Sequence, residues 1–155
     1  MRISVFGMGY VGTVSAACFA ELGHDVIGVD PAKIDMINCG LSPVVEEGLD
    51  ETVAAGVKAR RLRAIADTEA AVLQSDVSLI SVGTPMGRTG APTLDALDAV
   101  VDGIGSALRH KNGGQTGVLR STVPPGTTEG RMPILDLQGV PALVQLPGAR
   151  YRSLC

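Results

Sequence analysis

Short aliphatic runs alternate along this sequence with stretches in which apolar residues recur at helical spacing. The aliphatic runs predict buried strands, which lie at residues 2–6, 25–29, 62–66, 77–82, 117–120 and 140–146. The helical spacing predicts helices at residues 10–22, 33–38, 47–55, 69–74, 94–108 and from 124 to about 135. Strands that alternate with helices indicate an α/β fold, a doubly wound parallel sheet that binds its ligands at the carboxyl ends of the strands.

The composition agrees with such a fold and argues against other classes of protein. Hydrophobic residues make up 45% of the 155 residues and aromatic residues only 3%, so the core must be aliphatic, as in a parallel sheet covered by helices. The net charge is -3 and no basic run is present, which argues against nucleic-acid binding. The aliphatic runs are too short to span a membrane, and the N-terminus enters a strand at once, without the apolar region of a signal peptide. We therefore expect a cytoplasmic protein.

The three cysteines, Cys18, Cys39 and Cys155, are odd in number, far apart and without C-x-x-C spacing. They predict neither a disulfide framework nor a metal site. Cys18 falls on the apolar face predicted for the helix at residues 10–22, and there we expect it to be buried as a small hydrophobic residue.

A glycine motif follows the first predicted strand and opens the first predicted helix. In this G-x-G-x-x-G pattern, Gly7 permits a tight turn, Gly9 lets a pyrophosphate approach the backbone, and Gly12 lets the helix pack closely on the sheet. Tyr10 and Val11 would offer N–H groups to the phosphates at the positive end of the helix. The motif therefore predicts dinucleotide binding, and a glycine-rich turn without a ligand is the alternative.

Asp30 ends the second predicted strand and favours NAD as the dinucleotide. A carboxylate there can accept the ribose hydroxyls of the adenosine, and it would repel the 2′-phosphate of NADP. The alternative is that Asp30 caps the next helix, a role that can coexist with ribose binding. Lys33, three residues further on, could reach the adenosine or phosphate region of the cofactor, or simply be solvated.

Two threonines follow later predicted strands. Thr84 comes after the strand at 77–82 and Thr122 after the strand at 117–120, so both lie at the same level of the sheet. Both would face the nicotinamide half of a bound dinucleotide. The alternatives are an ordinary turn for Thr84 and a helix N-cap for Thr122.

Five segments together resemble the UDP-glucose/GDP-mannose dehydrogenase family: RISVFGMGYVG, ELGHDVIGVD, KIDMINCGLSPVVEEGL, SDVSLISVGTP and RSTVPPGTT. They occur in the order of the family, over residues 1 to about 136. The stretch SPVVEEGL matters most, because a dinucleotide-binding fold does not require it. It is similar to the family pattern S-P-[IV]-x-E-P-G-L, with Glu47 in place of the usual proline. The resemblance implies a Rossmann-type NAD-binding domain over residues 1–140.

The resemblance also implies a reaction. Family members oxidise the C6 alcohol of a nucleotide sugar to a carboxylate with two NAD molecules in succession, and a cysteine nucleophile carries the second half. By motif, the contacts to NAD would include Tyr10, Val11, Asp30, Lys33, Thr84 and Thr122. The start ISVFGMGYVG, the strand SDVSLISVGTP, and RSTV in place of KSTV favour GDP-mannose over UDP-glucose as the sugar.

The chain departs from the family after the last strand of this domain. Relatives carry an Asn-Pro-Glu-Phe-Leu-Arg-Glu segment there, whereas this chain reads VQLPGARYRSLC over residues 144–155. The central helix, the C-terminal domain and the nucleophilic cysteine of the family have no counterpart. We therefore expect a truncated or frame-shifted member that lacks catalysis alone, and residues 141–155 form a divergent tail for which disorder is one expectation.

Other functional classes stay open on the sequence. The chain could be a stand-alone NAD-binding or regulatory module, or a non-functional fragment. A complete small reductase is disfavoured, because there is no Tyr-x-x-x-Lys pair and because His24 and His110 are expected to be exposed rather than catalytic. A chain without the second domain would expose apolar surface that relatives bury, so we also expect self-association.

Overall fold

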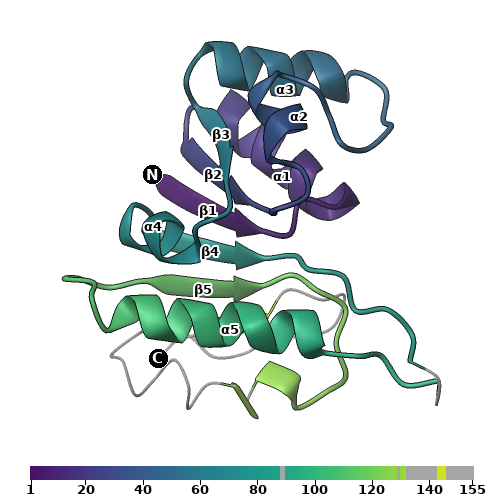
Figure 1. Ribbon diagram of the computed structural model, residues 1–155, viewed down its shortest axis with the longest axis vertical. Helices are drawn as coiled ribbons and strands as arrows, with labels where there is room; N and C mark the ends of the chain where they lie inside the picture. The colour runs from purple at the N-terminus through teal and green to yellow at the C-terminus, as the bar shows by residue number, and fades with distance from the viewer. Residues whose placement is uncertain (88–89, 129, 132–142, 146–155) are drawn as a thin grey trace.

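In the computed structural model, a parallel sheet forms the middle layer and helices cover both of its faces (Figure 1). The structure describes residues 1–87, 90–128, 130–131 and 143–145. The strands are β1 (Arg2–Phe6), β2 (Asp25–Val29), β3 (Leu62–Ile65), β4 (Val77–Ile80), β5 (Thr116–Leu119) and β6 (Leu143–Gln145). The helices are α1 (Tyr10–Glu21), α2 (Ile34–Asn38), α3 (Leu49–Lys58), α4 (Thr68–Leu73) and α5 (Asp95–Leu108).

The order of the strands is β3-β2-β1-β4-β5-β6, and every neighbouring pair is parallel. The chain starts in the middle of the sheet, builds outwards to β3, and returns to the middle with β4. This is the strand order of the doubly wound dinucleotide-binding fold, so the predicted fold class is confirmed. The sheet extends through β6 into the segment predicted as a tail, whose residues 141–142 and 146–155 lie outside the described part of the chain.

Each face of the sheet carries its own hydrophobic core. On one face Phe6 and Ile80 pack with residues of α4 and α5, such as Leu97. On the other face Val5 packs with residues of α1, α2 and α3, such as Ala17. Successive side chains of a strand point to opposite faces, which is why the neighbours Val5 and Phe6 enter different cores.

Helix α1 packs through small residues. Its buried positions are Gly12, Thr13, Ala16, Ala17 and Ala20. Near the end of α1 the packing against α3 is so close that a Cβ added to Gly56 would lie 3.2 Å from the Cβ of Ala20. The expectation that Cys18 is buried is wrong: Cys18 is exposed, and Leu22 on the same predicted face is 72% exposed. The buried face of α1 is the one that carries Gly12, Ala16 and Ala20, and Cys18 and Leu22 lie outside it.

Local geometry explains where helix α3 begins. Helix α3 starts at Leu49, two residues later than predicted. Gly48 has a φ of +76°, in the left-handed region, so it cannot be part of a right-handed helix. After β5, residues 127–128 and 130–131 are helical, and the predicted continuation to about residue 135 lies outside the described residues. No helix in the described part of the chain has the length and apolar content needed to cross a membrane.

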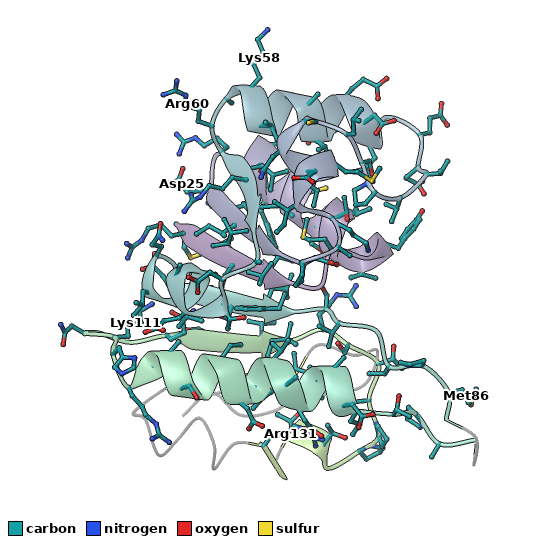
Figure 2. All side chains as sticks on the ribbon, in the orientation of Figure 1. Asp25, Lys58, Arg60, Met86, Lys111 and Arg131 are labelled. Carbon is teal, nitrogen blue, oxygen red and sulfur yellow. The ribbon has the colours of Figure 1, made fainter. Side chains whose placement is uncertain are left out.

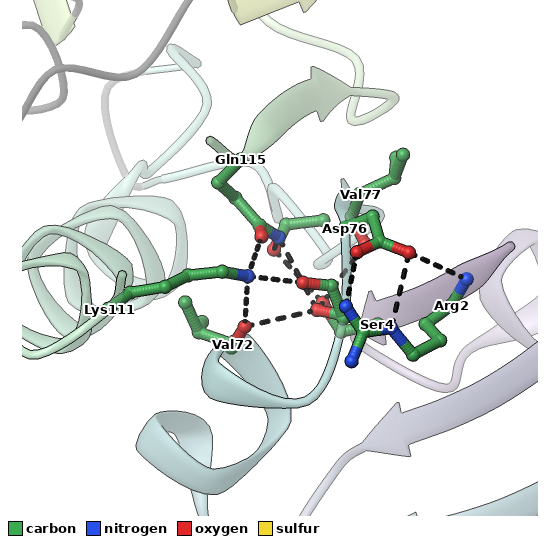
Figure 3. Close-up of polar contacts among 9 residues, drawn as sticks. Arg2, Ser4, Val72, Asp76, Val77, Lys111 and Gln115 are labelled. Carbon is green, nitrogen blue, oxygen red and sulfur yellow. Dashed lines mark hydrogen bonds and ion pairs between the residues drawn. The ribbon is translucent and has the colours of Figure 1, made fainter. Parts of the chain in front are cut away.

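A buried polar network lies at the amino-terminal ends of the central strands (Figure 3). Ser4 Oγ lies 2.9 Å from Ser78 Oγ and 3.0 Å from Ser75 Oγ, and Gln115 Nε2 donates to Ser78 Oγ at 2.7 Å. Lys111 Nζ donates to Gln115 Oε1 at 2.5 Å and to two backbone carbonyl oxygens near the end of α4. Burial lowers the pKa of the Lys111 ammonium. The network ties β1, β4, α4 and the start of β5 together at the edge opposite the carboxyl ends.

An exposed ion pair lies beside this network. Arg2 Nη2 is 2.5 Å from Asp76 Oδ1 (Figure 3). The hydrogen bond between the two side chains lowers the pKa of Asp76 and raises that of Arg2. The pair therefore stabilises the fold above the ordinary carboxylate pKa and loses this effect as the pH falls through the lowered one. The effect is small because both side chains are about half exposed.

Candidate functional site

A cleft of about 580 Å³ opens at the carboxyl ends of β1, β2 and β4. The order of the strands reverses between β1 and β4, and doubly wound folds bind their ligands at such a switch point. The walls come from the turn after β1, the residues after β2, the end of β4 and one side of α5. They include Gly7, Gly9, Asp30, Pro31, Lys33, Ala66, Ser81, Val82, Gly83, Ala96, Ala99 and Val100.

Glycine is found at positions 7, 9 and 12 of the turn after β1 for different structural reasons. Gly7 has a φ of +86°, and a Cβ added to Gly12 would lie 1.9 Å from the carbonyl oxygen of Gly7. A Cβ added to Gly9, in contrast, would meet no atom within 4 Å, although Gly9 lines the cleft. The fold itself thus requires glycine at positions 7 and 12. At Gly9 the open space fits the close approach of a ligand such as a pyrophosphate.

The amino-terminal end of α1 adjoins the same cleft. Gly9 is the N-cap of this helix, with no side-chain capping bond and no acidic residue in the first turn. The first N–H groups of a helix have no partner within the helix, and they carry the positive end of its dipole. Tyr10 and Val11, the first two helical residues, are 54% and 41% exposed, so this end is open to an anionic ligand.

Asp30 follows β2 directly, and its carboxylate reaches back to the glycine turn. Asp30 Oδ2 accepts a hydrogen bond from Met8 N at 3.0 Å, and Asp30 Oδ1 accepts one from Ala32 N at 3.2 Å. Both oxygens keep lone pairs that can accept the hydroxyls of a ribose. The alternative role as a helix cap is not seen, because the N-cap of α2 is Lys33.

Lys33 lies against the glycine turn and is not simply solvated. Its Nζ donates to the carbonyl oxygen of Met8 at 2.7 Å and is 3.6 Å from Asp30 Oδ2. The Lys33 side chain is only 28% exposed and lines the cleft. In this structure its ammonium therefore binds the protein backbone at the position from which it could also reach a cofactor.

Thr84 and Thr122 come together at the ends of β4 and β5, as the sequence predicted. Thr84 Oγ1 donates to the carbonyl oxygen of Thr122 at 2.8 Å. Since the hydroxyl proton of Thr84 is used for this bond, Thr84 can offer a ligand its lone pairs. Ser121 Oγ donates to the carbonyl oxygen of Val82 at 2.7 Å, which links the same two strand ends a second time.

Two residues that support the turn were not predicted. Ser81 Oγ donates to the carbonyl oxygen of Gly7 at 2.9 Å, and Thr13 Oγ1 donates to that of Met8 at 3.0 Å. Each had a signal in the sequence. Ser81 lies at the ligand end of a buried strand, and Thr13 is a polar residue at a buried position of a helix made mainly of small residues.

The fold, the glycine turn and the acid after β2 define a dinucleotide-binding domain. Residues 1–140 match the UDP-glucose/GDP-mannose dehydrogenase family, NAD binding domain. The chain belongs to this family, and its cofactor is NAD. The resemblance expected from the five sequence segments is confirmed.

Several of the similar proteins are dehydrogenases of GDP-mannose or UDP-glucose. GDP-mannose 6-dehydrogenase of Azotobacter vinelandii is 51% identical over 139 residues, which are 88% of this chain and 32% of that protein. UDP-glucose 6-dehydrogenase of Rhizobium meliloti is 43% identical over 130 residues, 82% of this chain and 29% of that protein. A crystal structure of a ternary complex of GDP-mannose dehydrogenase from Pseudomonas aeruginosa matches with a TM-score of 0.86 at 48% identity, covering 90% of this chain and 33% of that one. The chain thus spans about a third of the length of these relatives.

Proposed function

We propose that this chain is the NAD-binding domain of a nucleotide-sugar 6-dehydrogenase that oxidises the C6 alcohol of GDP-mannose to the carboxylate with two NAD. The observation that carries the proposal is the open space beside Gly9, next to the carboxylate of Asp30 in one cleft. The higher identity to GDP-mannose 6-dehydrogenase than to UDP-glucose 6-dehydrogenase supports the choice of sugar, and UDP-glucose is the alternative. The proposal includes the cytoplasmic location expected from the sequence.

The residues of this chain would bind and orient NAD. The turn of Gly7, Gly9 and Gly12 would admit the pyrophosphate, and the N–H groups of Tyr10 and Val11 would donate to it. The helix dipole adds a favourable field at the same point, because the amino-terminal end of α1 adjoins the cleft.

The two ends of the dinucleotide would meet different side chains. Asp30, with Lys33 beside it, would accept the ribose hydroxyls of the adenosine, while Thr84 and Thr122 would face the nicotinamide half. The chemistry that NAD supplies when bound is the acceptance of a hydride. The nucleophilic cysteine that the resemblance implies has no counterpart among these 155 residues, so we expect no catalysis by this chain alone.

Titration calorimetry of the 155-residue chain tests the proposal. We expect NAD to bind and NADP to bind more weakly. Asp30→Asn should weaken NAD binding about tenfold or more, since a hydrogen bond to a charged group is worth about 1.5–3 kcal/mol. The same change should reduce the preference for NAD over NADP, because the charge that repels the 2′-phosphate is gone.

A matched control separates the site from a general effect of charge. Asp35→Asn removes an exposed carboxylate in the first turn of α2 and should leave both affinities unchanged. If the chain is folded by circular dichroism and gives no heat with NAD, the proposal is wrong. If Asp35→Asn lost as much affinity for NAD as Asp30→Asn, the specific role proposed for Asp30 would be wrong.

We also expect the isolated chain to self-associate. Large apolar side chains are exposed on α2 and in the loop between α2 and α3: Met36 on α2 by 44%, and Leu41 and Val45 in the loop by 52% and 100%. Exposed apolar groups of this kind favour association. Light scattering should show a mass that rises with concentration. A monodisperse monomer at high concentration would contradict the expectation and favour a stand-alone module.

A further inference from the structure

The two peptide groups that flank the Cα of Met8 are both held by hydrogen bonds. Its N–H donates to Asp30 Oδ2 at 3.0 Å. Its carbonyl oxygen accepts two hydrogen bonds, from Lys33 Nζ at 2.7 Å and from Thr13 Oγ1 at 3.0 Å. Asp30 and Lys33 both belong to the segment after β2, so this segment holds two consecutive peptide groups of the turn after β1: Asp30 holds Gly7–Met8 and Lys33 holds Met8–Gly9.

The side chain of Met8 fixes the residue from the other direction. Met8 is fully buried, and a Cβ added to Gly28 in β2 would lie 2.9 Å from its sulfur. With the side chain enclosed, the freedom that remains is rotation of the two peptide groups that flank Met8. These two peptide groups connect Met8 to Gly7 and to Gly9, which line the cleft, so their orientation sets the shape of the turn.

The contacts of Lys33 differ from those of an ordinary surface lysine. Lys58, at the end of α3, points away from the molecule (Figure 2). Lys33 is 28% exposed, and its ammonium lies between a carbonyl oxygen at 2.7 Å and a carboxylate oxygen at 3.6 Å. A hydrogen bond from a charged donor is stronger than one between neutral groups, so Lys33 is the strongest donor to Met8 O.

We propose that Lys33 is a positioning residue for the dinucleotide site: through the carbonyl oxygen of Met8 it holds the Met8–Gly9 peptide group, and with it the backbone of the glycine turn, in the orientation that accepts a pyrophosphate. This inference rests on the proposed function and deepens it. The effect of Lys33 on binding is then exerted through the turn, and it is present in the protein before NAD arrives.

The test measures the turn in the free protein and the binding separately. In Lys33→Met, we expect hydrogen exchange of the Met8 amide, followed by NMR, to be about tenfold faster, while amides in the middle of β1 and β4 are unchanged. NAD should bind about tenfold more weakly, as expected for the loss of one charge-assisted hydrogen bond. Lys33→Arg, which keeps a charged donor, should restore both quantities to within about threefold. Lys58→Met is the matched control and should change neither.

Each result decides the matter. If Lys33→Met weakens NAD binding without changing exchange of the Met8 amide, Lys33 acts on the cofactor directly and the proposal is overturned. It is also overturned if the Met8 amide exchanges faster while NAD affinity stays the same. Because exchange is measured without NAD, an unchanged Met8 amide refutes the role of Lys33 in the turn even where wild-type protein binds no NAD. That absence of binding would by itself refute only the proposed function.

Discussion

Gly12→Ala is expected to destabilise the protein by about 3 kcal/mol, near the upper end of what overpacking usually costs. The added Cβ would lie 1.9 Å from the carbonyl oxygen of Gly7 and 2.7 Å from Ser81 Oγ. The nearer atom belongs to the backbone of the turn, so no change of rotamer can relieve the overlap. Helix α1 would have to move away from the sheet. Urea unfolding followed by circular dichroism should show the loss, and NAD binding should fall with it.

Gly9→Ala is the matched control for this prediction. A Cβ at Gly9 would meet nothing within 4 Å, and the φ of -74° and ψ of -162° are open to alanine. Stability should stay within about 1 kcal/mol of wild type, while NAD binding should fall about tenfold or more, as expected for one or two weakened hydrogen bonds to phosphate. Equal loss of stability in both variants would show that the close contact at Gly12 is not what makes glycine necessary there.

The parts of the fold that the sequence predicted are those that local pattern determines. Aliphatic strands that alternate with helices define a parallel sheet, and the spacing of Gly7 and Gly12 relative to β1 and α1 defines the turn between them. Asp30 could be predicted for the same reason, because a strand end at a fixed distance from the turn sets its place. Periodicity failed at Cys18 because the buried face of α1 is made of glycine, alanine and threonine, so the larger apolar residues of this helix do not mark it.

The contacts that the sequence did not predict join residues that are far apart along the chain. Lys33 binds a backbone oxygen 25 positions away. Thr84 and Thr122 were expected at the same level of the sheet, but the bond from Thr84 to the backbone oxygen of Thr122, 38 positions away, was not. A backbone carbonyl has no residue type that a motif could recognise, so neither bond can be read from the sequence. The network around Gln115 has the same character, because it forms only after β1, β4 and β5 have paired.

Gln115→Leu should lower the free energy of unfolding by about 2–4 kcal/mol, the range expected when two buried groups each lose one hydrogen-bond partner. Gln115 is 2% exposed, accepts from Lys111 Nζ, and donates to Ser78 Oγ at 2.7 Å and Ser75 Oγ at 3.3 Å. Leucine fills a similar volume but makes none of these bonds. Burial already disfavours the charged form of Lys111 and lowers its pKa, so loss of an acceptor would destabilise its ammonium further. Thermal or urea unfolding measures the change.

Gln74→Leu is the control for this prediction, since Gln74 is exposed and its side chain accepts one bond, from Arg63 Nη2 at 2.7 Å. The free energy of unfolding of this variant should differ from that of wild type by less than about 0.5 kcal/mol. An equal loss in the two variants would mean that the buried network contributes nothing specific. Gln115 lies at the amino-terminal edge of the sheet and the cleft lies at the carboxyl ends, so folded Gln115→Leu should bind NAD as wild type does. Gly9→Ala should show the reverse, with stability kept and affinity lost. The two variants together place stability and cofactor binding at opposite edges of one sheet.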